Sequence, residues 1–321
     1  MRSCVSFAVG LAMFEWYRDW DYTLTCAQLV FFMMGMGAKL ALAEFIKIFH
    51  QPRSLLYGLT FQIACVPMLA VLINHLAGLE AGIALGLILV SLMPGGSVSK
   101  VFAHLGVGNV ALTIVLSGIS TLAAIVTVPL LLELLAFEYV PENFVMPLDR
   151  VVYEVALFLL LPLAVGMLLA RWLPARRRII SRWCVRVGWG FLIVVVAASL
   201  GSGRIQPDQY GWRAPLAIIF FCLVAQQASM LPYYFLNWPR RDRLAIGIEV
   251  TMRNMNLALL LRLSFPEEHH LGLLFVILFY AAVAMFAGVP LALNHLRLAR
   301  REANALNYHE RHERHEKDVT C

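Results

Sequence analysis

The sequence predicts an all-α polytopic membrane protein with about nine transmembrane helices. Apolar residues make up 60% of the 321-residue chain, its mean hydropathy is +0.74, and only 14% of residues are charged. A soluble domain of this length could not bury so much apolar surface. Apolar stretches of about 20 residues, enough to cross a hydrocarbon core of roughly 30 Å as a helix, recur along nearly the whole chain. Lipid is therefore the expected solvent for most of the protein.

Short polar turns separate these apolar stretches and define the predicted spans. The spans cover residues 23–48, 55–78, 81–105, 109–137, 149–173, 182–202, 212–237, 243–265 and 270–296. An earlier apolar run, residues 3–14, is too short to span and lacks a small-x-small cleavage signal, so we expect a clipped helix rather than a signal peptide. The predicted organisation is an N-terminal segment over 1–22, a transmembrane domain over 23–297 and a charged tail over 298–321.

Basic residues are distributed unequally between the two ends of the spans. One end holds Lys47, Arg53, Arg171, Arg176, Arg177, Arg178, Arg182, Arg240, Arg241, Arg243, Arg297, Arg300, Arg301, Arg311, Arg314 and Lys317. The other end holds Arg2, Arg18, Arg150, Arg204 and Arg213. The positive-inside rule then places the C-terminus in the cytoplasm and the N-terminus outside, in the plasma (inner) membrane. The net charge of +6 follows from this topology and does not indicate a nucleic-acid partner.

Two predicted spans are interrupted by polar or flexible residues. Pro94, Gly95, Gly96 and Ser97 break the span 81–105, where unpaired backbone groups are tolerated only beside a polar cavity. The span 243–265 carries a polar cluster that runs from Glu249 to Asn256. Interrupted helices in the two halves of a membrane protein indicate a binding site between them.

A weak repeat of one residue spacing supports two related halves of the chain. Gln62 lies five residues before Pro67, and Gln227 lies five residues before Pro232. Each pair stands one span before an interrupted span. This position relative to the breaks favours an internal repeat.

Three charged residues lie near the middle of predicted spans: Lys100, Glu249 and Arg253. Each ionised group costs about 2.5–3.5 kcal/mol at a helix centre on insertion scales. An ion pair of Glu249 with Lys100 or with Arg253 would offset much of this cost. Such a pair could simply hold two helices together, but that interpretation leaves the adjoining Pro-Gly-Gly break unexplained.

Other charged residues call for simpler interpretations. Five lie within about two turns of a span end, where snorkelling to the interface suffices. They are Lys39, Glu44, Glu154, Arg186 and Arg262. Tail histidines alternate with Glu and Arg, as in a solvated helix, so we expect no metal site. No catalytic motif is present beyond a formal SxxK match at Ser97, so neither an enzyme nor a cofactor is expected.

The spacing from Gln62 to the Pro-Gly-Gly break, with a downstream Gly-Asn-x-Ala-Leu, resembles the bile acid:sodium symporter family. The resemblance covers about Leu29 to Pro290. Its landmarks are Gly35-Met36-Gly37, Gln62, Pro67, Pro94-Gly95-Gly96-Ser97-Val98-Ser99, Gly108-Asn109-Val110-Ala111-Leu112-Thr113, Ser120-Thr121-Leu122, Glu249-Val250 and Met252-Arg253-Asn254.

This resemblance implies inverted repeats, with two broken, crossing helices in a core domain beside a panel domain. It also implies an organic anion bound near the crossing and moved by alternating access. The implied substrate contacts are Gly95, Gly96, Ser97, Arg253 and Asn254. The positions implied for one sodium are Ser99, Lys100, Thr113, Ser117 and Glu249. Those implied for a second sodium are Gln62, Glu249, Val250, Met252 and Arg253, partly through backbone carbonyls.

Two of these positions depart from the family pattern. The family typically has Asn where this chain has Lys100, and Gln where it has Arg253. Each built-in cation would fill the place and charge of a missing ion beside Glu249 and repel sodium. We therefore expect a sodium-independent secondary transporter of a small or amphipathic organic anion, bile-acid-like or a carboxylate.

Alternatives from the sequence remain open. One is an ordinary sodium-coupled symporter, and another is a non-transporting membrane receptor or sensor that binds an organic anion in the same cavity. A related arsenite exporter would need a cysteine in the broken helix, and none lies between Pro94 and Leu105. The particular anion, the direction of transport and the oligomeric state are not determined by the sequence.

Overall fold

The computed structural model of the chain describes residues 20, 22–38, 52–96, 98–141, 144–145, 147–201, 210–236 and 238–319. The predicted N-terminal segment over 1–22 lies almost wholly outside these residues, as do Ser97, Lys39 and Glu44. Every regular element within the described ranges is a helix. The protein is thus an all-α membrane protein.

Five described helices are long and apolar enough to cross a membrane by length and composition. Several are composites of shorter segments. The first joins α3 (Pro52–Thr60), η1 (Phe61–Cys65) and α4 (Val66–Ala77); the second joins α7 (Val110–Ala136) and η2 (Phe137–Tyr139); the third joins α8 (Leu148–Glu154), η3 (Val155–Leu160) and α9 (Leu161–Trp172). The fourth is α11 (Arg213–Phe235), and the fifth joins η7 (Glu267–His269) and the first part of α14 (His270–Val319).

The remaining helices are shorter or more polar. Apolar helices of 10–17 residues cover Tyr22–Gly37, α5 (Ala81–Leu92) and Met255–Ser264, the last composed of α13 (Met255–Leu261) and η6 (Arg262–Ser264). The others are α6 (Ser99–Leu105), η4 (Pro174–Arg176), α10 (Arg177–Gly201) and α12 (Arg240–Thr251). The helix α14 continues to Val319, so the segment predicted as a tail after residue 297 extends this helix as far as that residue.

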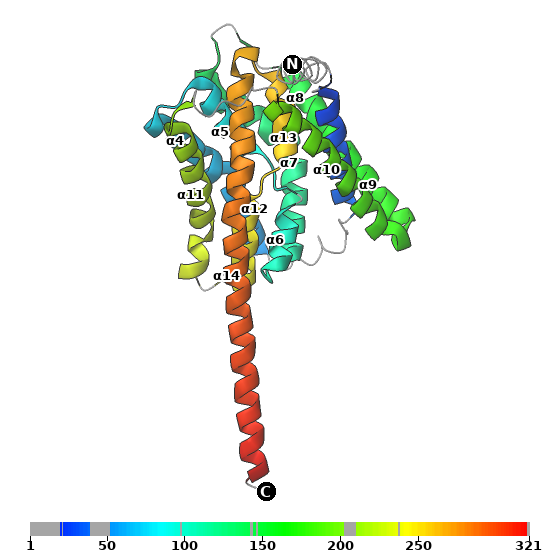
Figure 1. The fold of residues 1–321 in the computed structure, drawn as a ribbon, viewed down its shortest axis with the longest axis vertical. Helices are drawn as coiled ribbons and strands as arrows, with labels where there is room; N and C mark the ends of the chain where they lie inside the picture. Colours follow the sequence, from blue (N-terminus) through cyan, green and yellow to red (C-terminus); the bar gives the residue numbers. More distant parts are fainter. Residues whose placement is uncertain are drawn as a thin grey trace, which may run out of the picture.

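Figure 1 shows α14 running the length of the body and projecting beyond it, with α4 and α11 on one side and α9 and α10 on the other. The helix α14 packs against α5, α11 and α12. The helix over Tyr22–Gly37 packs against α10 through aromatic pairs, with ring centroids 5.9 Å apart for Phe31–Phe191 and 5.8 Å apart for Phe32–Trp189. The crossing of the interrupted helices lies between these flanks.

The two interrupted helices meet at their breaks. The helix α5 ends at Leu92 and α6 begins at Ser99, whereas α12 ends at Thr251 and α13 begins at Met255. A short antiparallel bridge joins Gly95 to Arg253. The Gly96 amide donates to the Met252 carbonyl (2.7 Å), and the Asn254 amide donates to the Pro94 carbonyl (2.8 Å). Each break therefore supplies backbone partners that the other needs inside a membrane.

The two glutamines of the predicted repeat, Gln62 and Gln227, differ in burial. Gln62 is buried in the π-helical turn η1, just before Pro67, whose missing amide accounts for the irregular turn. Gln227 is exposed, whereas its neighbour Gln226 is buried and donates to Thr251 Oγ1 at 3.1 Å. Gln226 is thus the residue that faces the interior.

Snorkelling is also the wrong interpretation for two charged residues. Glu154 and Arg262 are 1% and 2% exposed. Each has one partner in a neighbouring turn: Arg150 Nε lies 2.9 Å from Glu154 Oε1, and Arg262 Nε donates to the Leu259 carbonyl. Proximity to a span end did not reveal these internal partners. Arg186, by contrast, is exposed as expected.

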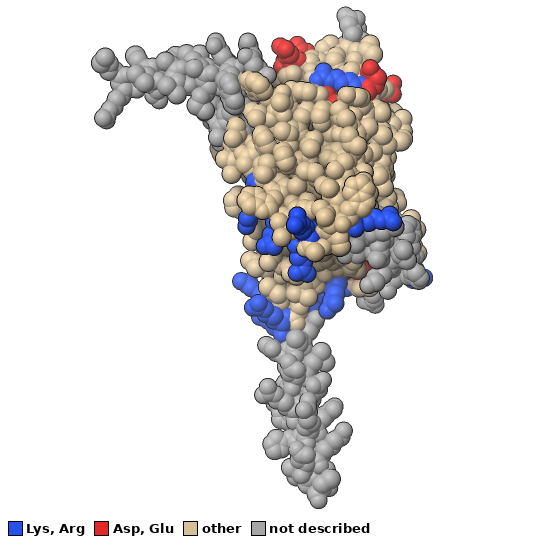
Figure 2. All heavy atoms as spheres, turned by 90° about the vertical axis from the view of Figure 1, so that its right-hand side faces the viewer, with Lys and Arg blue, Asp and Glu red and all other residues tan. Residues whose placement is uncertain are grey.

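The face seen in Figure 2 has a wide, almost uncharged band, with most Lys and Arg side chains gathered towards one end of it and acidic side chains beside a smaller basic patch at the other. Exposed leucine, valine, phenylalanine and tryptophan side chains are common along the long helices. In water such a surface would associate, but in lipid it is the stable one.

Candidate functional site

The centre of the crossing requires glycine at two positions. A Cβ atom on Gly95 would overlap the carboxylate oxygen Oε1 of Glu249 and lie 2.9 Å from Ser117 Oγ. On Gly96 it would lie 2.7 Å from the Arg253 carbonyl oxygen. Only glycine permits both the tight bridge and the close approach of the carboxylate. The Pro-Gly-Gly sequence thus lets the backbones of the two breaks and the Glu249 carboxylate lie close together.

Three of the predicted sodium-position residues form a chain of hydrogen bonds. Lys100 on α6 donates to Ser117 Oγ on α7, and Ser117 Oγ donates to Glu249 Oε1 on α12. Lys100 Nζ also donates to the Gly96 carbonyl at 3.0 Å, and Ser99 Oγ donates to the same oxygen at 2.8 Å. Glu249 is 1% exposed. The ammonium group is therefore linked through Ser117 to the buried carboxylate.

Arg253 directs its guanidinium at backbone oxygens. Its Nε donates to the Val250 carbonyl at 2.8 Å, and its Nη1 donates to the Met93 carbonyl at 2.9 Å. The side chain is 5% exposed and interacts electrostatically with Glu249. One guanidinium thus ties the end of α12 to the end of α5.

The carbonyls in the second break already have donors. The Val250 oxygen accepts from Arg253 Nε, the Thr251 oxygen from Tyr280 Oη (3.0 Å), and the Met252 oxygen from the Gly96 amide. A cation bound through the Val250 and Met252 carbonyls, the positions implied by the family resemblance, would have to displace or share these donors. Within the described residues, each of these three carbonyls thus accepts a hydrogen bond from the chain itself.

Asn254, expected to contact substrate, serves locally as a helix cap. Its Oδ1 accepts from the Leu257 amide at 3.3 Å and caps α13, as Asn109 caps α7 by accepting from the Leu112 amide at 3.1 Å. Asn254 is 2% exposed, and its Nδ2 lies 3.9 Å from Met33 Sδ. Its role in binding stays a prediction.

The structure does not join every predicted residue to this cluster. Thr113 is fully buried, and its hydroxyl donates to the Val110 carbonyl of its own helix. Gln62 is 3% exposed, and within the described part of the chain neither of its amide atoms has a hydrogen-bond partner. The same holds for the second carboxylate oxygen of Glu249 and for Nη2 of Arg253. Ser97 lies outside the described residues.

Sequence reasoning missed the polar layer behind the crossing. Tyr280 on α14 is 1% exposed and donates to the Thr251 carbonyl, and Gln226 on α11 donates to the Thr251 hydroxyl. That hydroxyl in turn donates to the Gly247 carbonyl at 2.7 Å. A tyrosine in the middle of an apolar span was the available signal, because a buried phenol needs a partner.

Comparison with known proteins agrees with this architecture. A model of the sodium bile acid symporter family matches residues 27–205, more than half of the chain. The chain is 28% identical to a probable chloroplastic sodium/metabolite cotransporter of Arabidopsis thaliana over 80% of its own length, but it spans only 63% of that protein, less than two thirds.

Two further relatives are covered more completely. An uncharacterized sodium-dependent transporter of Bacillus subtilis is 28% identical over 79% of this chain and 78% of its own. The human sodium-dependent organic anion transporter is 23% identical over 85% of this chain and 72% of its own. On the family match, the chain belongs to the sodium bile acid symporter family.

Proposed function

We propose that this protein is a secondary transporter that moves a small or amphipathic organic anion by alternating access, without sodium. The family match and the names of relatives, which include an organic anion transporter and a sodium/metabolite cotransporter, support the transport class. In this proposal nine spans form a core domain and a panel domain in the plasma membrane, with the C-terminus in the cytoplasm. The anion binds beside the crossing, near Gly95, Gly96, Ser97 and Asn254.

The observation that carries sodium independence is the attachment of Arg253 and Lys100 to the oxygens around Glu249. The guanidinium donates to the Val250 carbonyl, and the ammonium is linked to Glu249 through Ser117. Unit charges about 4 Å apart interact by about 4 kcal/mol at an effective dielectric constant of 20. A sodium ion entering this cluster would meet repulsion of that order from each built-in cation.

The shortage of free oxygen ligands for a sodium ion also supports sodium independence. Sodium needs several oxygen ligands, and the Gly96, Val250 and Met252 carbonyls each accept a hydrogen bond already. The names of several relatives denote sodium coupling, so the proposal separates this chain from them at two positions, Lys100 and Arg253. The proposed difference in sodium coupling between this chain and its relatives therefore depends on these two residues and not on a different fold.

Loss of sodium coupling changes the energetics of transport. A monoanion entering against an inside-negative potential faces about 2.3 kcal/mol per 100 mV. Uncoupled movement therefore favours export, and import would need anion exchange, a steep substrate gradient or protons. A proton could be carried by Lys100, because Arg253 stays charged at all accessible pH values.

Flux into proteoliposomes tests the proposal. The purified protein would be reconstituted and supplied with radiolabelled taurocholate or a short monocarboxylate. Sodium or choline would be equal on both sides, or sodium would be present outside only, and a potassium–valinomycin potential of either sign would be applied. We expect flux that is unchanged by sodium and reversed by the sign of the potential. Binding of an anion without any flux would instead favour a receptor, and flux that requires a sodium gradient would contradict sodium independence.

A further inference from the structure

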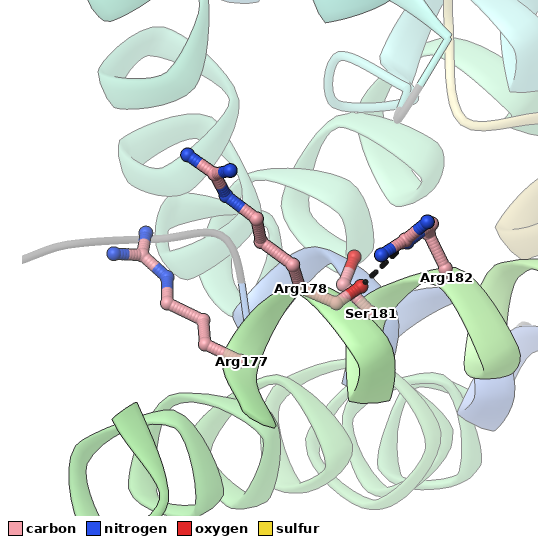
Figure 3. Close-up of a pocket in the computed structure, with 4 residues that line it drawn as sticks. All are labelled: Arg177, Arg178, Ser181 and Arg182. Carbon is pink, nitrogen blue, oxygen red and sulfur yellow. Dashed lines mark hydrogen bonds between the residues drawn. The ribbon is translucent and has the colours of Figure 1, made fainter. Parts of the chain in front are cut away.

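The start of α10 holds a basic pocket that is separate from the crossing. Its volume is about 440 Å³, and it is lined by Arg177, Arg178, Ser181 and Arg182 (Figure 3). Volumes of roughly 300–1,000 Å³ are typical of small-ligand sites. None of these residues belongs to the interrupted helices, so the proposed transport site leaves the pocket unexplained.

Internal contacts fix the wall of the pocket. The Ser181 hydroxyl is buried and donates to the Gly35 carbonyl at 2.8 Å. Arg177 Nε donates to the Ala38 carbonyl at 2.8 Å, so this arginine fastens α10 to the end of the first described helix. These bonds hold the α10 backbone against its neighbour.

Arg178 and Arg182 are the exposed cations of the pocket. Both side chains are exposed, and Arg182 Nε donates to the Arg178 carbonyl at 3.3 Å, near the limit for a hydrogen bond. Figure 3 shows Arg177 and Arg178 extending from the same side of the helix, while Arg182 reaches back over Ser181. The described lining contains three guanidinium groups and no carboxylate. Several positive charges lining one pocket favour a bound anion there.

The surroundings place the pocket at a membrane interface. Trp172, just before it, is 68% exposed, and Trp183, just after it, is 60% exposed. The Arg186 guanidinium lies 5.8 Å from the centroid of the Trp183 ring. Exposed tryptophans beside arginines are typical of the headgroup layer of a bilayer. An anion presented from the lipid would therefore reach this pocket without crossing hydrocarbon.

We propose that Arg177, Arg178, Ser181 and Arg182 form a binding site for a phosphate group, carried by the headgroup of an anionic membrane lipid. Guanidinium groups bind phosphate oxygens in a bidentate manner, which lysine cannot do, and all three cations here are arginines. Basic pockets at the ends of membrane helices bind lipid phosphates in this way. The site does not depend on the proposed transport function.

The test compares two pairs of substitutions in the full chain. Arg178→Gln with Arg182→Gln removes two pocket cations that, within the described residues, form no hydrogen bond to another helix. Arg171→Gln with Arg176→Gln removes two exposed arginines that do not line the pocket and serves as the matched control. Each protein would be placed in nanodiscs of phosphatidylcholine or of phosphatidylcholine with phosphatidylglycerol, at fixed ionic strength. Its melting temperature and the lipid retained in native mass spectrometry would be measured.

We expect phosphatidylglycerol to raise the melting temperature of the native protein and of the control pair. The variant with Arg178→Gln and Arg182→Gln should lose this shift. It should also retain at least roughly tenfold less phosphatidylglycerol than the native protein. Inorganic phosphate added to phosphatidylcholine nanodiscs distinguishes the sources: no shift supports a lipid ligand, whereas an equal shift supports a phosphate site filled from solution. Equal losses in the two pairs, or no shift of the native protein with either phosphatidylglycerol or inorganic phosphate, would overturn the site.

Discussion

Arg253 Nε lies 2.8 Å from the carbonyl oxygen of Val250, the residue three positions earlier in the chain. The same guanidinium reaches the Met93 carbonyl across the crossing at 2.9 Å. A single side chain thus closes the end of α12 and ties it to the opposite break. The same cation interacts electrostatically with the buried Glu249.

The two-bond geometry of the Arg253 guanidinium, and not only its charge, should contribute to the stability of the protein. Arg253→Lys keeps the charge, but an ammonium group cannot reproduce both bonds in their geometry, so one buried carbonyl is left without this donor. We expect a loss of about 1–3 kcal/mol in stability, measured by thermal or denaturant unfolding in detergent, with no stabilisation by sodium. Stability equal to the native protein would show that charge alone suffices.

Removal of the Glu249 carboxylate should lower the stability of the protein more than removal of either hydrogen bond of Arg253. Glu249→Gln leaves Lys100 and Arg253 without their buried counter-charge, which typically costs about 3–5 kcal/mol. Lys100→Met in the same chain should restore part of this loss. A double-mutant cycle on the unfolding free energies measures the coupling, which we expect to exceed about 1 kcal/mol. Strictly additive effects would mean that Ser117 does not connect the two charges.

Substitution of Gly95 tests the close approach of Glu249. The added methyl group of Gly95→Ala would overlap Glu249 Oε1, so the crossing must open, at a cost of about 1–3 kcal/mol or more, and transport should be lost. Gly82→Ala on the same interrupted helix is the control, because its new Cβ meets its nearest neighbours at 3.5 Å, an ordinary contact. Melting temperatures of the two variants should differ clearly, and similar values would argue against the tight crossing.

The layer behind the crossing can be examined through Tyr280. Tyr280→Phe removes the only group of this side chain that donates to the Thr251 carbonyl, and we expect a loss of about 0.5–1.5 kcal/mol with slower transport. Tyr153→Phe provides the comparison, because Tyr153 is 61% exposed and its substitution should stay within about 0.5 kcal/mol. An unchanged melting temperature in Tyr280→Phe would remove Tyr280 from the supports of the crossing.

Much of the architecture could be predicted from local sequence. Proline and two glycines inside an apolar span predict an interruption, since a missing amide and flexible backbone cannot continue a helix in lipid, and α5 does end at Leu92. The mid-span charges Lys100 and Glu249 could be grouped because neither is stable alone in hydrocarbon. The helix break and the grouping of the charges could thus be predicted from the apolar pattern and from the cost of burying a charge.

What the sequence did not contain was the orientation of side chains about each helix axis. Gln226 and Gln227 are chemically identical neighbours, and only packing against α12 decides which of them faces Thr251. The burial of Arg262 depends on a turn made by its own chain, which a distance from the span end cannot reveal. The role of Ser117 as the link between Lys100 and Glu249 likewise required three helices in place.

The most direct measurement is the melting temperature of the purified protein across a sodium titration at constant ionic strength, with choline as the balancing cation. It is made in parallel on Lys100→Asn combined with Arg253→Gln. A ligand that binds only the folded state at one hundred times its dissociation constant stabilises that state by about 2.7 kcal/mol, which is readily detected. We expect no response to sodium in the native protein and a saturable stabilisation of the double variant. Saturable stabilisation of the native protein by sodium would contradict the tethered cations and indicate an ordinary sodium symporter.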